Sequence, residues 1–146
     1  MIELESERLF IREIAADDLE RWQRDWAVAQ MMPGRHMLAC YLKADGAAVG
    51  FAEYWEEVDD GWPWFGALTL HKAHQRQGLG LEAARRLLAH FRQDYGWPLV
   101  RAGVMEQNEA GLALARRLDF QPVERGLRRF PGGKQAYIVF ERLLTD

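Results

Sequence analysis

Apolar and polar residues alternate in several short stretches in the first half of the chain, and this two-residue period predicts strands. The turn "ADG" joins two of these stretches, which predicts a hairpin. A second turn near Asp59–Gly61 leads into another strand, so we expect an antiparallel meander. The predicted strands cover Arg8–Ile14, His36–Lys43, 47–58 and Trp64–His71.

Three other stretches repeat apolar residues every three to four positions, which predicts amphipathic helices. The first, Asp18–Val28, follows a capping box of Asp17 and Glu20. The second covers 80–96 and is closed by glycine and proline. The third covers 108–120, with Asn108 at its N-cap.

The remaining segments complete a mixed fold. A buried-type strand is expected at 98–105, and a closing hairpin at 121–130 and 134–144. The order is strand, helix, antiparallel meander, helix, strand, helix, hairpin, without repeats or linkers. The pattern therefore predicts an α/β (α+β) fold, with one mostly antiparallel sheet flanked by helices in a single domain over residues 1–146.

The composition argues against several classes of protein and of site. The 146 residues are 49% apolar and 28% charged with a net charge of -3, which is typical of a soluble globular protein and argues against general nucleic-acid binding. One cysteine excludes an internal disulfide or a multi-cysteine metal site, the histidines lack metal-type spacing, and we expect no metal. No apolar run approaches the ~20 residues of a membrane span. The N-terminus does not resemble a signal peptide, so we expect a cytoplasmic protein.

The run "HQRQGLG", residues 74–80, stands between a predicted strand and a predicted helix. The first N–H groups of a helix lack partners and favour an anion, and glycine lets the backbone approach it closely. A simple tight turn would explain the glycines equally well. The G-x-G-x-x-A pattern of "GLGLEA" also allows a dinucleotide-binding enzyme, although the antiparallel meander upstream is unlike the parallel units of that fold.

The segment "QRQGLG" resembles the Q/R-x-x-G-x-G/A signature of the GNAT superfamily of acyl-CoA-dependent N-acyltransferases, and "NEAGLALARRLDF" looks like the second region of that family. The resemblance implies a GNAT-like fold that transfers an acetyl group from acetyl-CoA to a primary amine in a ternary complex. The acceptor would be a small-molecule or peptide amine, and a homodimer stays open. The resemblance also implies the coenzyme A contacts, which are Leu70, Gln75, Arg76, Gln77, Gly78, Leu79, Gly80 and Asn108.

The chain departs from the family at both familiar acid-base positions. Ala115 stands where many members have a tyrosine that protonates the departing thiolate, and Trp64 where many have a glutamate base. These departures leave a second function open, that of a GNAT-like domain that binds acyl-CoA as a sensor without turnover.

An acidic, tryptophan-rich stretch, 52–64, offers a replacement base. A turn near Asp59–Gly61 would place Trp64 opposite Glu56 or Glu57, so we expect one of these glutamates to take over the catalytic role. Tryptophan faces would add cation–π contacts to a cationic amine. A solvated acidic turn with tryptophans in the core is the alternative.

Overall fold

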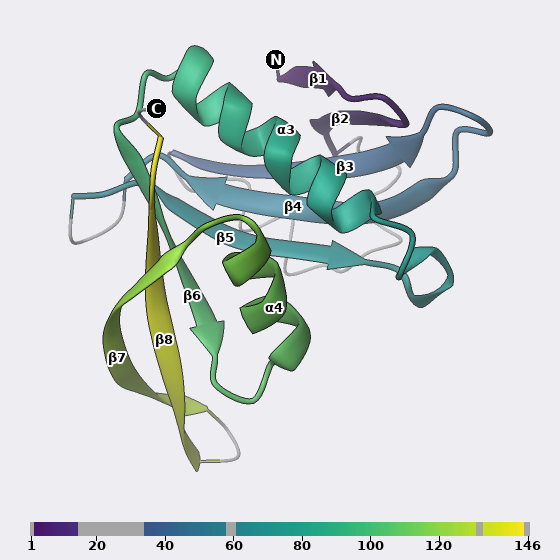
Figure 1. Ribbon diagram of the computed structural model, residues 1–146. Helices are drawn as coiled ribbons and strands as arrows, with labels where there is room; N and C mark the ends of the chain where they lie inside the picture. Colours follow the sequence, from purple (N-terminus) through teal and green to yellow (C-terminus); the bar gives the residue numbers. More distant parts are fainter. Residues whose placement is uncertain (1, 15–33, 58–60, 131–132, 145–146) are drawn as a thin grey trace.

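The computed structural model describes residues 2–14, 34–57, 61–130 and 133–144. Eight strands form one continuous sheet, in the order β1-β2-β3-β4-β5-β6-β8-β7 (Figure 1). Every neighbouring pair is antiparallel except β5 and β6. The strands are β1 (Glu3–Glu5), β2 (Leu9–Glu13), β3 (Arg35–Leu42), β4 (Ala48–Trp55), β5 (Trp64–Leu70), β6 (Leu99–Met105), β7 (Gln121–Phe130) and β8 (Gly133–Leu143).

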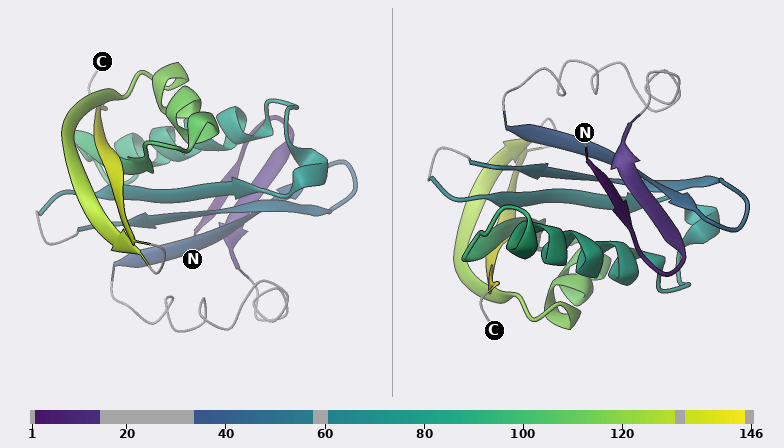
Figure 2. Two further views of the ribbon diagram at one scale, coloured as in Figure 1. Left: turned by 90° about the horizontal axis from the view of Figure 1, so that it is seen from below. Right: turned by 90° about the horizontal axis from the view of Figure 1, so that it is seen from above.

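Two α-helices pack on the same face of this sheet, α3 (Leu79–Gln93) and α4 (Glu109–Arg117) (Figure 2). A single 3-10 turn, η1 (Lys72–His74), precedes α3. Beyond the end of α3, Gly96 has a left-handed φ of 70°, and its N–H donates to the carbonyl of Arg92 at 3.1 Å. This is a glycine-based helix ending, as the sequence predicts.

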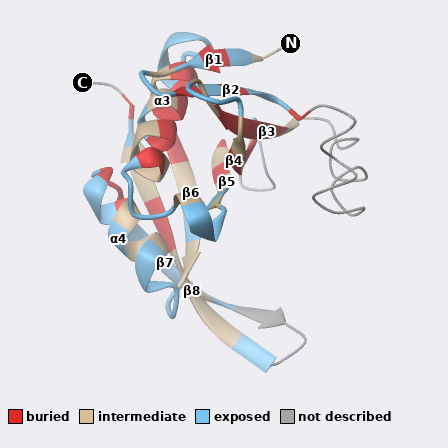
Figure 3. Cartoon of the chain, turned by 90° about the vertical axis from the view of Figure 1, so that its right-hand side faces the viewer, coloured by how far each residue is buried: buried red, intermediate tan, exposed pale blue. Residues whose placement is uncertain are grey.

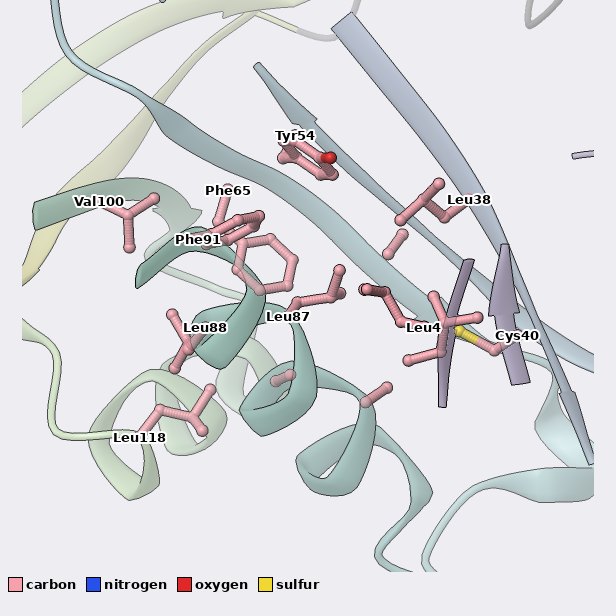
Figure 4. Close-up of a cluster of buried hydrophobic side chains, with 14 of the residues drawn as sticks. Leu4, Leu38, Cys40, Tyr54, Phe65, Leu87, Leu88, Phe91, Val100 and Leu118 are labelled. Carbon is pink, nitrogen blue, oxygen red and sulfur yellow. The ribbon is translucent and has the colours of Figure 1, made fainter. Parts of the chain in front are cut away.

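The core lies between α3 and the sheet. Leu87 and Phe91 of α3 are fully buried against strand residues such as Leu38 and Tyr54 (Figures 3 and 4). The hydroxyl of Tyr54 is within 3.3 Å of His90 Nε2 and 2.9 Å of the Tyr95 hydroxyl, so these buried polar atoms have partners. Burial, followed by the hydrogen bond to Tyr95, raises the pKa of Tyr54 well above its usual range. This face of the sheet is therefore a packed core that holds α3 in a fixed position.

Most predicted elements are confirmed within one to three residues at their ends. The meander, the two helices that follow it and the closing hairpin all occur in the predicted order. The short strand β1 was not predicted, because three residues are too few to establish a period. The predicted helix Asp18–Val28 lies outside the described residues.

Candidate active site

Strands β5 and β6 form a wedge that opens the sheet. They run parallel, and in these described strands they pair at one position, Trp64 with Arg101. The N–H of Arg101 donates to the carbonyl of Pro63 at 3.0 Å, which closes the base of the wedge. Beyond it the strands diverge, as Figure 1 shows. Backbone polar groups on the two facing edges are thereby left for a ligand, because unpaired strand edges present N–H and C=O groups.

A cavity of about 250 Å³ occupies this opening. Its walls come from both strands of the wedge and from α3 and α4, with Ala115 and Leu118 among the helical residues. Glycines stand on both strands, at Gly66 and Gly103, so no side chain from these positions fills the gap. The cavity is suited to a slender, partly apolar chain that pairs with strand edges.

The glycine-bearing loop lies at the mouth of the wedge, between the end of β5 and the start of α3. Gly78 is the N-cap of α3 with a left-handed φ of 79°, and Arg76 is also left-handed, with φ of 65°. Gly80 lies in the first turn, and a Cβ atom there would lie 3.4 Å from Leu70 Cδ1. The helix N-terminus and its dipole favour an anion at this position.

Side chains hold this loop in place. The guanidinium of Arg8 donates from Nη1 to the carbonyl of Gln77 at 3.0 Å and from Nε to Glu82 Oε1 at 2.7 Å. Gln75 Nε2 donates to the carbonyl of Leu70 at 3.0 Å, which ties the loop to the end of β5. The structure thus brings together six of the sequence-predicted contacts, residues 75–80, with Leu70 beside them.

Asn108 lies on the other side of the mouth and lines the cavity. It caps α4 as predicted, because its Oδ1 accepts the N–H of Gly111 at 2.9 Å. A Cβ atom at Gly111 would lie 2.6 Å from Asn108 Nδ2, so only glycine fits beneath this amide. The capping bond uses Oδ1 as its acceptor, so the N–H groups of Nδ2 remain potential donors at the mouth of the cavity.

A β-bulge interrupts the ladder between β4 and β5. Glu53 is opposite Ala67 and Tyr54 is opposite Phe65, so Gly66 is the extra residue on β5. The extra residue of a bulge is left out of the regular ladder, which frees backbone groups beside the cavity. The sequence contains the signal, a glycine inside a predicted strand, but not its location in the register.

Glu53 belongs to the acidic stretch 52–64, but the sequence pattern does not distinguish it as the candidate base. The residue is only 9% exposed, and Oε2 accepts from Arg35 Nη2 at 2.8 Å. Arg35 also lies over the ring of Trp55, 5.1 Å from its centroid. A Cβ atom at Gly66 would lie 3.1 Å from Glu53 Oε1 and 3.3 Å from the Trp55 ring. Buried carboxylates are uncommon, and this one lies directly behind a glycine of the cavity wall.

The predicted register of Glu56 and Glu57 is wrong. Trp64 pairs with Trp55, and β4 ends there, so neither glutamate lies opposite Trp64. The bulge at Gly66 displaces the pairing that a simple hairpin count gives. Both glutamates are exposed, and Glu56 Oε2 lies 2.7 Å from His36 Nε2. Glu57 lies beyond the strand, and the predicted turn lies partly outside the described residues.

Other candidates are placed away from the wedge or carry no reactive group. Cys40 is fully buried, as expected for a core residue, and burial raises the pKa of its thiol to about 12. Ala115 is buried in the cavity wall, so no side-chain proton donor stands at its position. Within the described residues, no group of three or more His, Cys, Asp and Glu side chains could hold a metal ion. Nor does any described helix have the length and apolar character needed to cross a bilayer.

Comparisons with solved structures give the same fold. A protein from Bordetella pertussis described as a GnaT-family acetyltransferase is 24% identical, with a TM-score of 0.77 over 97% of this chain and 99% of that chain. A ribosomal-protein-S5-alanine acetyltransferase from Vibrio fischeri is 12% identical, with a TM-score of 0.77 over 100% and 98%. A spermidine/spermine N-acetyltransferase from Vibrio cholerae is 12% identical, with a TM-score of 0.75 over 94% and 93%. No curated protein matches the chain.

The model of the acetyltransferase (GNAT) domain family matches residues 7–121, which contain the wedge, the glycine-bearing loop and the capped α4. The mostly antiparallel sheet, with one parallel pair, also differs from the repeated parallel units of a dinucleotide-binding fold. Sequence family, sheet topology and cavity agree, and the chain belongs to the GNAT acetyltransferase family.

Proposed function

We propose that the protein transfers an acetyl group from acetyl-CoA to a primary amine by direct attack within a ternary complex. The observation that carries this proposal is the continuity of the site. A helix N-terminus suited to an anion, two unpaired strand edges and a cavity with glycine walls follow one another along the wedge. Acetyl-CoA has a matching order of diphosphate, amide-containing arm and small acyl group.

The residues that would hold acetyl-CoA follow from this order. Backbone N–H groups of Gln77, Gly78, Leu79 and Gly80, with the side chains of Gln75 and Arg76, would bind the diphosphate. The backbone of Leu70 would pair with the arm on the β5 side, and Asn108 Nδ2 would donate to it from the other side. The acyl group would then reach the bulge at Gly66, where backbone groups lie outside the ladder.

The acceptor is proposed to be an amine of a small molecule or a peptide. The Vibrio proteins that share this fold are named for acetylation of a ribosomal-protein alanine and of polyamines. A lysine-type amine with a pKa near 10.4 costs about 4–5 kcal/mol to be neutral at pH 7, and a peptide α-amine with a pKa near 7.8 costs about 1 kcal/mol. The wedge would hold the amine of either class close to the thioester. This proximity lowers the barrier to acetyl transfer without a dedicated acid.

A transfer assay tests the proposal. The protein is incubated with acetyl-CoA and a panel of spermidine, lysine and peptides with free N-termini, while thiol release and the mass of each amine are followed. We expect thiol release that depends on the amine, with one acetyl group added to it. Tight binding of acetyl-CoA without acetylation of any amine would favour the sensor function instead. The absence of acetyl-CoA binding would contradict both functions.

A further inference from the structure

We infer that Glu53 is the catalytic base of this site and that it removes a proton from the acceptor amine where its carboxylate lies against Gly66 in the cavity wall. The inference rests on the proposed function, because it names the residue that prepares the amine for attack. It also replaces Glu56 and Glu57, the bases expected from the sequence, with a residue that the bulge brings to the cavity wall.

The side chain of Glu53 lies on the face of the sheet opposite the core. Pairing partners across antiparallel strands share a face, and Tyr54 and Phe65 both belong to the core on the α3 face. Glu53 precedes Tyr54 on β4, so it points to the opposite face. The cavity is lined by α3 and α4, which lie on the first face. Glu53 therefore approaches the wedge from the face opposite α3 and α4.

The carboxylate of Glu53 lies close to Gly66. A Cβ atom there would lie 3.1 Å from Glu53 Oε1, tighter than ordinary van der Waals contact. Because residue 66 has no side chain, the carboxylate can lie directly against the backbone of the cavity wall. Gly66 is itself part of that wall, so Oε1 lies next to the place proposed for the acyl group.

The two carboxylate oxygens of Glu53 have different surroundings. Oε2 accepts from Arg35 at 2.8 Å, and Arg35 is in turn placed over Trp55. These contacts fix the carboxylate in one orientation. In the described part of the chain Arg35 is the polar side-chain partner of Glu53, so Oε1 is left to take a proton. Arg35 is thus a positioning residue, and Glu53 is the group that reacts.

The ammonium form of the acceptor gives one proton to Glu53, and the resulting neutral amine attacks the thioester carbonyl. A C–N bond forms and the C–S bond breaks, with the bonding pair leaving on sulfur. The nitrogen loses its second proton, which balances the thiol, and Glu53 later releases its proton to water. Ala115 needs no role, since the sulfur receives a proton that the acceptor carried.

The test compares four glutamine variants in the full chain. Glu53→Gln should lower kcat/KM for the best amine of the panel by about 10²–10⁴-fold at pH 7, the usual contribution of a general base. Its affinity for coenzyme A should match the parent protein by calorimetry. Glu56→Gln and Glu57→Gln test the two sequence-based candidates, and we expect each to change kcat/KM by less than about threefold, far below the contribution of a general base. Glu124→Gln, at an exposed position on β7, is the matched control.

The pH dependence separates a base from a merely structural carboxylate. The deficit of Glu53→Gln should shrink as pH rises toward the pKa of the amine, because solution then supplies the neutral nucleophile. A pH-independent deficit would contradict the base assignment. If Glu53→Gln folds poorly, the double variant Arg35→Gln/Glu53→Gln removes both charges of the pair, and the same pH-dependent deficit is expected from it.

Three outcomes overturn the inference in distinguishable ways. If the parent protein acetylates an amine and Glu53→Gln does so at the parental rate across the pH range, Glu53 is not the base, although the proposed function stands. If Glu56→Gln or Glu57→Gln carries the pH-dependent loss instead, the sequence-based assignment is right. If the parent protein acetylates no amine, the proposed function fails and this inference fails with it.

Discussion

At the scale of single residues, Gly78 and Gly46 have nearly the same left-handed backbone, with φ of 79° and 75°. Gly46 lies in the turn between β3 and β4, where a Cβ atom would meet nothing within 4 Å. Gly78 caps α3 beside the proposed diphosphate site, where a Cβ atom would lie 3.4 Å from Arg8 Nη2. The two glycines therefore share one backbone requirement and differ in their surroundings.

This pair gives a matched prediction. Gly78→Val and Gly46→Val should each destabilise the fold by at least about 1–2 kcal/mol, the cost of a left-handed L-residue. Only Gly78→Val should also weaken coenzyme A binding by tenfold or more, about 1.4 kcal/mol, because its side chain would displace the anion from the N–H groups. Thermal unfolding and calorimetry measure the two effects separately. Equal coenzyme A affinity in both folded variants would contradict the diphosphate assignment.

At the scale of elements, the turn between β1 and β2 fastens the start of α3. Glu82 accepts hydrogen bonds from the Ser6 hydroxyl at 2.5 Å, the Arg8 N–H at 2.8 Å and Arg8 Nε at 2.7 Å. Burial of the carboxyl raises its pKa, but the hydrogen bonds from Ser6 and Arg8 and the charge of Arg8 lower it more, so the net pKa lies below its usual value. Because Arg8 also holds the carbonyl of Gln77, this contact supports the glycine-bearing loop.

A prediction on pH-dependent stability follows for Glu82→Gln. A lowered folded-state pKa means that the contribution is present above the unfolded-state pKa, about 4.3, and is lost as pH falls through the lower folded-state value. The melting temperature of the parent protein should exceed that of Glu82→Gln by a constant margin from about pH 6 to 8, and the margin should shrink in acid below about pH 4. Glu109→Gln, an exposed glutamate in the first turn of α4, serves as the comparison. A margin that stays unchanged down to about pH 2 would contradict this account.

The splayed strands β5 and β6 are the second structural feature at the scale of elements. A parallel pair in a regular sheet would continue its hydrogen bonds, yet β5 and β6 pair at one position before they part. Each strand is held on its other side, β5 by β4 and β6 by β8, and Arg101 Nε lies 3.1 Å from Glu141 Oε2 across the latter pair. The wedge is thus kept open by the neighbouring strands and by the helices that line it.

At the scale of the whole molecule, the wedge divides the sheet into two parts. Strands β1 to β5 with α3 form one part, while β6, β8 and β7 form the other, and α4 follows β6 along the opening (Figure 1). A ligand in the wedge would contact both parts of the sheet. It would bind the folded chain and not the unfolded chain, because the wedge exists only in the folded chain. Binding should therefore raise the stability of the whole molecule through mass action.

Thermal unfolding with coenzyme A measures this effect. At a free concentration of 100 times Kd, coenzyme A should stabilise the protein by about 2.7 kcal/mol, and NAD at the same concentration should leave the melting temperature unchanged. Pantetheine, which has the arm without the diphosphate, should give a smaller increase. An equal increase with NAD and coenzyme A would contradict a site specific for the pantetheine arm.

The secondary-structure elements and helix caps could be predicted because they depend on the local pattern of the sequence. Periods of two and of three to four residues locate the strands and helices of the described chain, because side-chain alternation is a property of each element alone. The helix ends at Asn108 and Gly96 could be predicted in the same manner, since capping involves neighbours in sequence. Asp119, after α4, has a left-handed φ of 62°, a conformation that aspartate adopts more readily than most residues.

The sequence by itself determined the order of the elements, their caps and the glycine-bearing loop, because each depends on residues within a few positions of one another. Only the tertiary structure decided the register across β4 and β5, where one extra residue at Gly66 moves Trp64 opposite Trp55 and brings Glu53 to the cavity wall. A bulge reflects the combined demands of the core, the neighbouring strands and the twist of the sheet. These demands act between segments far apart in the chain, so no local pattern records them, and the proposed base therefore emerged from the fold.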